Sequence, residues 1–231
     1  NDKLDKEPKN KGLKKEIVSS ISFISDILGI GSKEDVLFFL GDYIDRGPSS
    51  SGVIDYLLKL KRKNYNIYTL RGNHEESILK ASAEYPKKEF YKYLKRILKS
   101  EDLLNKKKKL KKRYKKFFKQ TDFFYELEDF FLVHAGFNFK KKNFLEDKIS
   151  MLELRSWEFT LKKTKGKKII HGHRPTHYKK IKKAIKKNNR IPLDNGCVFN
   201  KKHKHYDHTQ LGKLCCLNLD KLELICQKNV D

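Results

Sequence analysis

Four short polar clusters, each following an apolar run, hold the residues that could do chemistry. They read FFLGDYIDRG (38–47), YTLRGNHEE (68–76), FFLVHAGF (130–137) and KIIHGHRPTH (168–177). Short runs of Val, Ile, Leu and Phe are typical of buried strands, so each cluster is predicted to lie where a strand ends. Asp, Asn and His side chains that converge from several strand ends are suitable ligands for a divalent metal ion. The four clusters together therefore predict a metal site at one edge of a sheet.

The first two clusters offer distinct chemical roles. The Asp42 carboxylate could bridge two cations, and the Arg46 guanidinium could hold a phosphate through two parallel hydrogen bonds. Asn73 offers an amide oxygen as a ligand. The neighbouring His74 could protonate a leaving oxygen, provided that a carboxylate such as Asp45 orients its imidazole.

The third and fourth clusters add His134 and His173, which complete a set of nitrogen and oxygen ligands. A single histidine after a strand is more often a structural residue than a ligand, and four such clusters in one chain favour the metal site. His171 could be an additional ligand, but a structural role is the expectation. The three histidines within 200–210 are expected to lie in a surface loop rather than to form a second metal site.

The composition limits the classes of protein that need to be considered. A chain of 231 residues is expected to form a single domain, 1–231. The net charge is +25, yet only eight of the 54 basic residues are Arg, which favours a solvated surface over a surface that binds polyanions. A membrane span needs about 18 apolar residues, and no apolar stretch in the sequence is nearly that long. No signal peptide is visible. Four cysteines without a C-x-x-C pair are expected to be reduced core residues, which predicts a cytoplasmic protein.

The apolar patterns predict an α/β fold with parallel units. The segment 86–119 is predicted to be a basic helical insertion. The other predicted helices cover 17–29, 52–63, 75–83 and 150–163, and a basic helix-like stretch precedes residue 190. The predicted strands cover 36–41, 66–71, 123–127, 130–134, 167–172, 190–196, 197–199, 213–219 and 221–227, with a hairpin turn at Asp220–Lys221.

The order of the motifs GDYIDRG, RGNHE, VHAG, HGHRP and LDNG resembles that of the calcineurin-like metallophosphoesterases, and specifically the serine/threonine phosphoprotein phosphatases. The resemblance covers roughly residues 17–227. It implies the metallophosphoesterase fold, a central β-sandwich of mixed sheets flanked by helices. It also implies two divalent metal ions, either Mn²⁺ or a mixture of Fe and Zn.

The resemblance further assigns roles to individual residues. Asp42 would bridge the two metals, and His74 would be the general acid paired with Asp45. The remaining ligands of the second metal would be Asn73, His134 and His173. Arg46 and, within LELRSWEF (152–159), Arg155 would bind phosphate, and Asp194 of LDNG would orient the metal ligands.

The first motif of the family, GD-x-HG, does not occur in this sequence. That motif supplies an Asp and a His to the first metal, so the first metal site is expected to be incomplete and the first strand to be missing. Truncation just upstream of Asn1, with an inserted stretch near residues 5–14, is the expected reason. A pseudoenzyme is the alternative.

These observations predict metal-dependent hydrolysis of phosphate monoesters, with phosphoserine or phosphothreonine in a protein as the leading substrate. The first alternative is a symmetrical dinucleoside tetraphosphate hydrolase, for which the Lys-rich segment 86–119 could favour a polyanionic substrate. The second alternative is a non-catalytic module that binds polyanions through 105–119. In that module Tyr114, Phe117 and Phe118 could stack on bases, although their helical spacing favours packing. The oligomeric state is not predicted.

Overall fold

The computed structural model describes residues 35–199, 207 and 209–229. The predicted helix over 17–29 lies outside these residues, as do the three histidines of the segment 200–210. In the described part, no helix is long and apolar enough to cross a membrane.

The first described unit is a parallel strand–helix–strand unit, as the sequence predicts. Strand β1 (Val36–Phe39) pairs in parallel with β2 (Asn66–Thr69), and helix α2 (Ser50–Arg62) connects them. The α2 helix begins where Ser49, in an extended conformation, accepts a hydrogen bond from the Gly52 amide at 3.1 Å. The loop between β1 and α2 carries the GDYIDRG motif.

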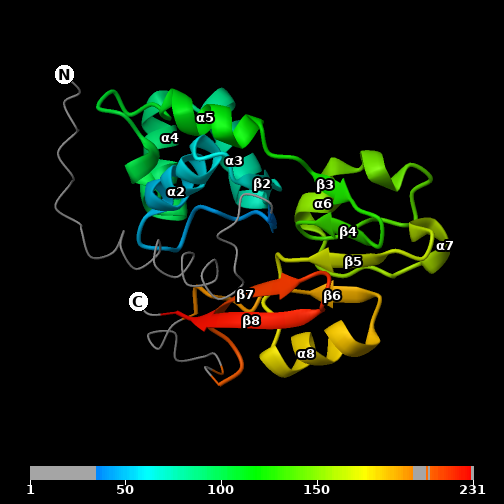
Figure 1. The fold of residues 1–231 in the computed structure, drawn as a ribbon. Coiled ribbons are helices and arrows are strands. Elements are labelled where there is room, and N and C mark those ends of the chain that lie inside the picture. The colour runs from blue at the N-terminus through cyan, green and yellow to red at the C-terminus, as the bar shows by residue number, and fades with distance from the viewer. Residues whose placement is uncertain (1–34, 200–206, 208, 230–231) are drawn as a thin grey trace.

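Helices pack together beside this unit (Figure 1). They are α3 (Asn73–Glu84), α4 (Lys87–Tyr93), the π-helical turn η1 (Leu94–Leu98), the 3₁₀ turn η2 (Glu101–Leu103) and α5 (Lys112–Lys119). Tyr114, Phe117 and Phe118 of α5 are all at most 2% exposed and belong to the core of this layer. Packing therefore occupies the aromatic rings of 105–119, and stacking on nucleic-acid bases is excluded for them.

A four-stranded mixed sheet forms the second layer, in the order β3-β4-β5-β6. Its strands are β3 (Phe124–Glu126), β4 (Phe130–Val133), β5 (Lys168–His171) and β6 (Arg190–Pro192). The β3–β4 pair is antiparallel, whereas β4, β5 and β6 run in parallel. Helix α8 (Tyr178–Lys187) joins β5 to β6 and packs Ile181 and Ile185 into the core beneath the sheet.

Three predicted elements differ from the structure. The predicted strand over 190–196 ends at Pro192, the last residue of β6. The single helix predicted over 150–163 is two short helices, α6 (Lys148–Glu153) and α7 (Leu161–Thr164), preceded by the 3₁₀ turn η3 (Phe144–Glu146). The α6 helix ends at Glu153, and the next residue, Leu154, has an extended conformation with φ −62° and ψ 122°. The predicted strand 197–199 is a turn, in which the Phe199 amide donates back to the Gly196 carbonyl at 2.9 Å.

The C-terminal strands β7 (Lys213–Asn218) and β8 (Glu223–Lys228) form the predicted antiparallel hairpin. Their register places Cys215 opposite Cys226 with a Cα–Cα distance of 4.3 Å, and the two form a disulfide. The expectation that all four cysteines are reduced is therefore wrong for this pair, because the cross-strand register brings together residues whose spacing carries no motif. Burial raises the pKa of the remaining hairpin thiol, Cys216, to about 11.

The sheets share one core, which positions the site loops. Side chains from β1, β4, β5, β6 and the hairpin meet in a single apolar cluster that α8 completes. Because β1, β4 and β5 enter this cluster together, the loops that follow them lie at a common edge. These loops carry the GDYIDRG, VHAG and HGHRP motifs.

Candidate metal centre

Three lone-pair atoms form a nearly equilateral triangle at the common edge. The Nε2 atom of His134 lies 3.1 Å from Oδ1 of Asn73 and 3.2 Å from Nδ1 of His173, and the last two atoms are 3.1 Å apart. Metal–nitrogen and metal–oxygen bonds of about 2.0–2.2 Å place neighbouring ligand atoms at similar separations. The triangle therefore matches three ligands of one cation.

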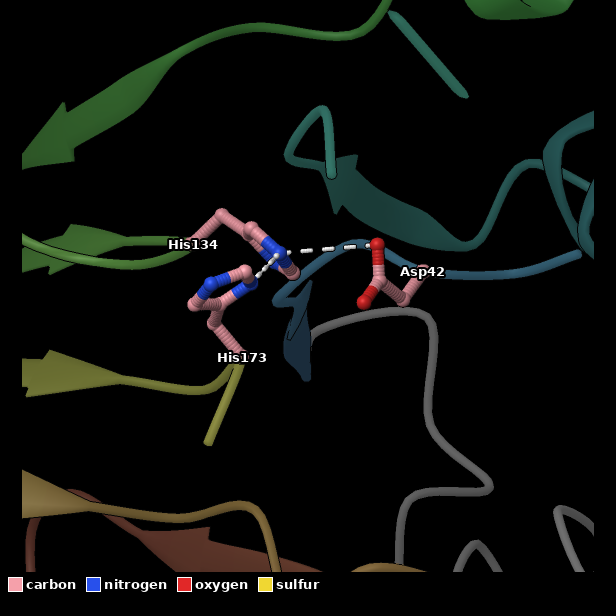
Figure 2. A group of neighbouring side chains, drawn as sticks. All are labelled: Asp42, His134 and His173. Atoms are coloured by element: carbon pink, nitrogen blue, oxygen red, sulfur yellow. Dashed lines mark hydrogen bonds and ion pairs between the residues drawn. The ribbon is translucent and has the colours of Figure 1, made fainter. Parts of the chain in front are cut away.

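Asp42 adds a carboxylate to this triangle. Its Oδ1 lies 3.4 Å from Nε2 of His134, and suitable atoms of Asp42, His134 and His173 all lie within 4.8 Å of one another. Figure 2 shows the carboxylate and the two imidazoles directed toward one another from separate segments of the chain. The structure thus brings together all four predicted ligands, and their nitrogen and oxygen donors fit a divalent cation.

A backbone contact fixes the orientation of His134. Its Nδ1 lies 2.7 Å from the carbonyl oxygen of Leu40, which can only accept a hydrogen bond. Nδ1 must therefore carry the proton, which leaves the Nε2 lone pair directed at the triangle. A hydrogen bond from the outer ring nitrogen to a carbonyl is a common support for a metal-binding histidine.

His173 is also held as a neutral ring. Burial lowers its pKa to about 4, and the neighbouring His134 adds to this effect, while the Asp42 carboxylate opposes it. Its Nε2 is buried and has no hydrogen-bond partner among the described residues, whereas Nδ1 faces the triangle. A neutral imidazole can offer a lone pair to a cation, and Nδ1 is the ring nitrogen of His173 that is placed to do so.

The site loops contain several residues in the left-handed region of backbone conformation. Asp42, Asp45, Arg46 and His173 have φ values of 57°, 75°, 60° and 67°. A residue other than glycine in this region raises the conformational free energy of the folded state by on the order of 1 kcal/mol, and such strain is concentrated at functional sites. The packed core must therefore maintain this loop geometry against a local conformational cost.

Glu75 connects the loop after β1 to the loop after β2. Its fully buried carboxylate accepts hydrogen bonds from the amides of Asp42, Tyr43 and Gly72 at 2.8–2.9 Å. Burial raises the pKa of Glu75 and the Asp42 charge adds to it, while the amide donors lower it. No role was predicted for Glu75 from the motifs. A Glu two residues after the helix start at Asn73 is nevertheless a recognisable capping signal.

The proposed general acid and its partner are in hydrogen-bond contact. Nδ1 of His74 lies 2.9 Å from Oδ2 of Asp45. Burial lowers the pKa of His74, but the hydrogen bond with Asp45 and the charges of Asp42, Asp45 and Glu75 raise it above the ordinary histidine value overall. The amide of Asp45 donates to the hydroxyls of Ser50 and Ser100, so α2 and the segment after η1 both support this pair.

The two predicted phosphate-binding arginines lie at the exposed rim of the centre. Burial lowers the pKa of His173 and the charge of Arg155 adds to this, whereas burial raises the pKa of Asp194 and the charge of Arg46 opposes that rise. No hydrogen bond or ion pair joins either guanidinium to the four predicted ligands in the described part of the chain. The loop also holds Arg174, whose guanidinium donates to the Arg155 carbonyl and which our sequence analysis did not consider.

His171 has the structural role that we expected. It is buried, packs its ring against Trp157 at 5.5 Å between centroids, and does not join the triangle. Burial lowers its pKa to about 4.

Comparisons with known proteins agree with this geometry. The family model of calcineurin-like phosphoesterases matches residues 17–210. A solved structure of a putative diadenosine tetraphosphatase superposes with a TM-score of 0.60 and 16% identity, covering 92% of this chain and 88% of that one. At this identity the superposition establishes the fold alone.

Similar curated proteins match over shorter stretches. The symmetrical bis(5′-nucleosyl)-tetraphosphatase of Wigglesworthia glossinidia brevipalpis is 35% identical over 85 residues, which is 37% of this chain and 30% of that protein. A putative serine/threonine-protein phosphatase of Caenorhabditis elegans is 56% identical over 43 residues, 18% of this chain and 12% of the relative. The cysteine–tRNA ligase of Aliarcobacter butzleri is 54% identical over 39 residues, 17% of this chain and 8% of the ligase.

Each of these matches covers less than a third of the curated relative, so none transfers a complete activity. The family match, in contrast, extends over most of the sequence and includes all the motif residues at the centre. The fold expected from those motifs, a mixed α/β metallophosphoesterase fold with flanking helices, is confirmed. The chain therefore belongs to the calcineurin-like phosphoesterase family.

Proposed function

We propose that this protein hydrolyses a phosphate ester or anhydride with the help of divalent cations bound at the centre described above. The observation that carries the proposal is the triangle of Asn73 Oδ1, His134 Nε2 and His173 Nδ1, with edges of 3.1–3.2 Å. A divalent cation bound there would polarise a phosphoryl oxygen and lower the pKa of a nearby water. Mn²⁺, or a mixture of Fe and Zn, is the metal content that we propose.

The protein's own residues would position the substrate and move a proton. Arg46 would donate two parallel hydrogen bonds to the non-bridging oxygens of the phosphate. His74, held by Asp45 at 2.9 Å, would give its proton to the leaving oxygen as the phosphorus–oxygen bond breaks. The raised pKa of His74 favours the protonated ring that this role requires.

By the resemblance of the GDYIDRG motif, we propose that the Asp42 carboxylate would be shared by two cations; its Oδ1 lies 3.4 Å from Nε2 of His134. The remaining ligands of the first cation belong to the GD-x-HG motif, which this sequence lacks. The residues at the centre therefore supply ligands for one cation, and the presence of the other cation is part of the proposal.

For the substrate, the comparisons support our alternative better than our leading expectation. The relative with 35% identity is a symmetrical bis(5′-nucleosyl)-tetraphosphatase, and the superposed structure is a putative diadenosine tetraphosphatase. We therefore propose a dinucleoside polyphosphate as the substrate, cleaved by water at its central anhydride to give two nucleoside diphosphates. A phosphoprotein remains the second candidate, because the 43-residue match to a putative serine/threonine-protein phosphatase is 56% identical.

A substrate comparison tests this proposal. The protein is incubated with Mn²⁺ and either diadenosine tetraphosphate or a phosphothreonine peptide, and products are separated by anion-exchange chromatography. We expect ADP as the only nucleotide product and a higher kcat/KM for the tetraphosphate. Preferential release of phosphate from the peptide would select the second candidate, and AMP with ATP would contradict symmetrical cleavage.

The matched control is His74→Asn, which removes the proposed proton donor and keeps the four ligands. Activity that persists unchanged in this variant would contradict the role of His74 as the proton donor. If neither substrate is cleaved and nucleic acid binds with a steep salt dependence, the non-catalytic alternative would be favoured.

A further inference from the structure

The arginines of this chain are distributed unevenly. Only eight of the 54 basic residues are Arg, yet Arg46, Arg155 and Arg174 all lie in the loops around the metal centre, and Arg190 stacks on Trp157 nearby. Arginine binds phosphate through a rigid planar fork, whereas lysine acts as a point charge. In a lysine-rich protein, arginines at these positions indicate that the planar geometry of the guanidinium is needed there, and not only its charge.

Two other arginines, Arg71 and Arg113, have carboxylate partners. Arg71 pairs with Glu76 at 2.9 Å, and Arg113 pairs with Asp55 at 3.0 Å. No ion pair with a carboxylate involves the guanidinium of Arg155 or Arg174 in the described part of the chain. These two charges are therefore available to an anionic ligand.

The backbone fixes the position of Arg174 relative to the centre. It follows the predicted ligand His173, and its amide donates to the Gly172 carbonyl at 2.8 Å in a tight turn. One N–H of its guanidinium donates to the backbone carbonyl of Arg155. A guanidinium has five N–H donors, so this contact anchors the side chain and leaves donors for a ligand.

A phosphate monoester does not need this many arginine side chains. Its single phosphate would be held at the metal centre by Arg46 and Arg155, whereas Arg174, which follows His173 and is anchored on the Arg155 carbonyl, is an additional guanidinium. A polyphosphate chain has further charged phosphates beyond the one that is attacked, and these require donors at the rim.

We propose that Arg174, anchored on the Arg155 carbonyl, is a specificity-determining residue that binds a phosphate adjacent to the one being attacked. It thereby selects polyphosphate chains over phosphate monoesters. This inference rests on the proposed function, since it names the part of the site that would recognise a dinucleoside polyphosphate.

The first test measures binding without turnover. Isothermal titration calorimetry in metal-free buffer at 0.15 M salt compares inorganic tripolyphosphate with orthophosphate. We expect Arg174→Gln to weaken tripolyphosphate binding about tenfold or more and to change orthophosphate binding less than about threefold. Arg174→Lys should restore only part of the loss, because it keeps the charge and removes the fork.

The matched control is Arg96→Gln, which removes the same charge from an exposed position on η1, in the helical layer. If both variants weaken tripolyphosphate binding equally, net charge alone explains the effect and the proposal is wrong. It is equally wrong if Arg174→Gln has no effect. Thermal melting of both variants identifies any loss of folding, and in that case Arg174→Lys supplies the comparison.

The second test uses turnover and separates the two proposals. With Mn²⁺, Arg174→Gln should raise the KM for diadenosine tetraphosphate and leave kcat/KM for p-nitrophenyl phosphate within about threefold of the wild type. An equal loss on both substrates would contradict a role in specificity. If the wild type cleaves only the monoester, the proposed substrate is wrong, while the tripolyphosphate titration still decides whether Arg174 binds a phosphate chain.

Discussion

The buried carboxylate of Glu75 accepts the backbone N–H of Asp42 at 2.9 Å, across 33 residues of sequence. Asp42 has a left-handed φ of 57°, which costs free energy in any residue other than glycine. Glu75 also accepts the amides of Tyr43 and Gly72, so one side chain holds both loops that carry the first two motifs. The position of the proposed bridging carboxylate thus depends on a residue that is not itself a ligand.

Replacing Glu75 with Gln tests this dependence. Glutamine keeps one acceptor oxygen and places an NH₂ group against a backbone donor, so we expect a loss of about 2 kcal/mol in the free energy of unfolding. Urea denaturation at pH 8 measures this loss. Glu84→Gln, at the exposed end of α3, is the control and should change stability by less than about 0.5 kcal/mol. Equal effects of the two substitutions would show that the loop contacts of Glu75 contribute nothing.

The metal ligands can be tested without an activity assay. Binding of Mn²⁺ should stabilise the folded state by about 2.7 kcal/mol at a hundredfold excess over Kd, and the melting temperature should rise as a result. His173→Ala removes one vertex of the triangle, so the shift should be lost or strongly reduced. His177→Ala, an exposed histidine at the start of α8, should retain it. Calorimetry that detects no Mn²⁺ uptake by the wild type would contradict the metal centre itself.

The proton-donor role of His74 predicts a division between turnover and binding. In the active protein, His74→Asn should lower kcat by about 10²–10⁴ and change the Kd for phosphate much less, because the ring acts on the leaving oxygen. Asp45→Asn should lower kcat in the same direction, since Asp45 orients the ring at 2.9 Å. Steady-state kinetics and phosphate inhibition constants provide the two readouts. Turnover of His74→Asn equal to the wild type would remove this role.

Gly136 in the VHAG motif is required for the packing of Trp157. A methyl group added at Gly136 would overlap the indole, whose Nε1 donates to the Ala135 carbonyl at 3.1 Å. We expect Gly136→Ala to destabilise the fold by about 1–3 kcal/mol and to displace the ring. Trp157 is the only tryptophan, so its fluorescence reports the displacement directly. Gly47→Ala, where an added methyl meets no close atom, should leave the emission spectrum unchanged.

Asp147 provides a pH dependence away from the metal centre. A hydrogen bond with Lys141 lowers the pKa of Asp147, burial opposes this, and the Ser150 hydroxyl and amide add to the lowering. A depressed folded-state pKa contributes stability that is complete above the unfolded value, about 3.9, and disappears as pH falls through the folded value. Asp147→Asn should therefore lower stability clearly at pH 7 and much less at pH 2–3.

Urea denaturation at both pH values measures this difference. The control is Asp129→Asn, which alters an exposed carboxylate before β4 and should have little effect at either pH. A loss that is the same at pH 7 and at the acidic pH would mean that Asp147 contributes through its shape alone.

The candidate ligands and the family were predictable because short motifs at strand ends depend on local sequence. A strand of Val, Leu and Phe followed by Gly-Asp or Gly-Asn-His has few structural alternatives, so Asp42, Asn73, His134 and His173 could be selected without coordinates. The hairpin turn predicted at 220–221, which covers residues 219–222 in the structure, is similarly local.

Other features required contacts between distant parts of the chain, which no local pattern encodes. Glu75, the Leu40 carbonyl that orients His134, and the anchoring of Arg174 on Arg155 each depend on which loops the packed core brings together. The Cys215–Cys226 disulfide likewise follows from a cross-strand register. The sequence alone therefore determined the chemical groups and the family, because these are written in local motifs. Tertiary structure decided how the groups are oriented, since orientation results from long-range packing and hydrogen bonds.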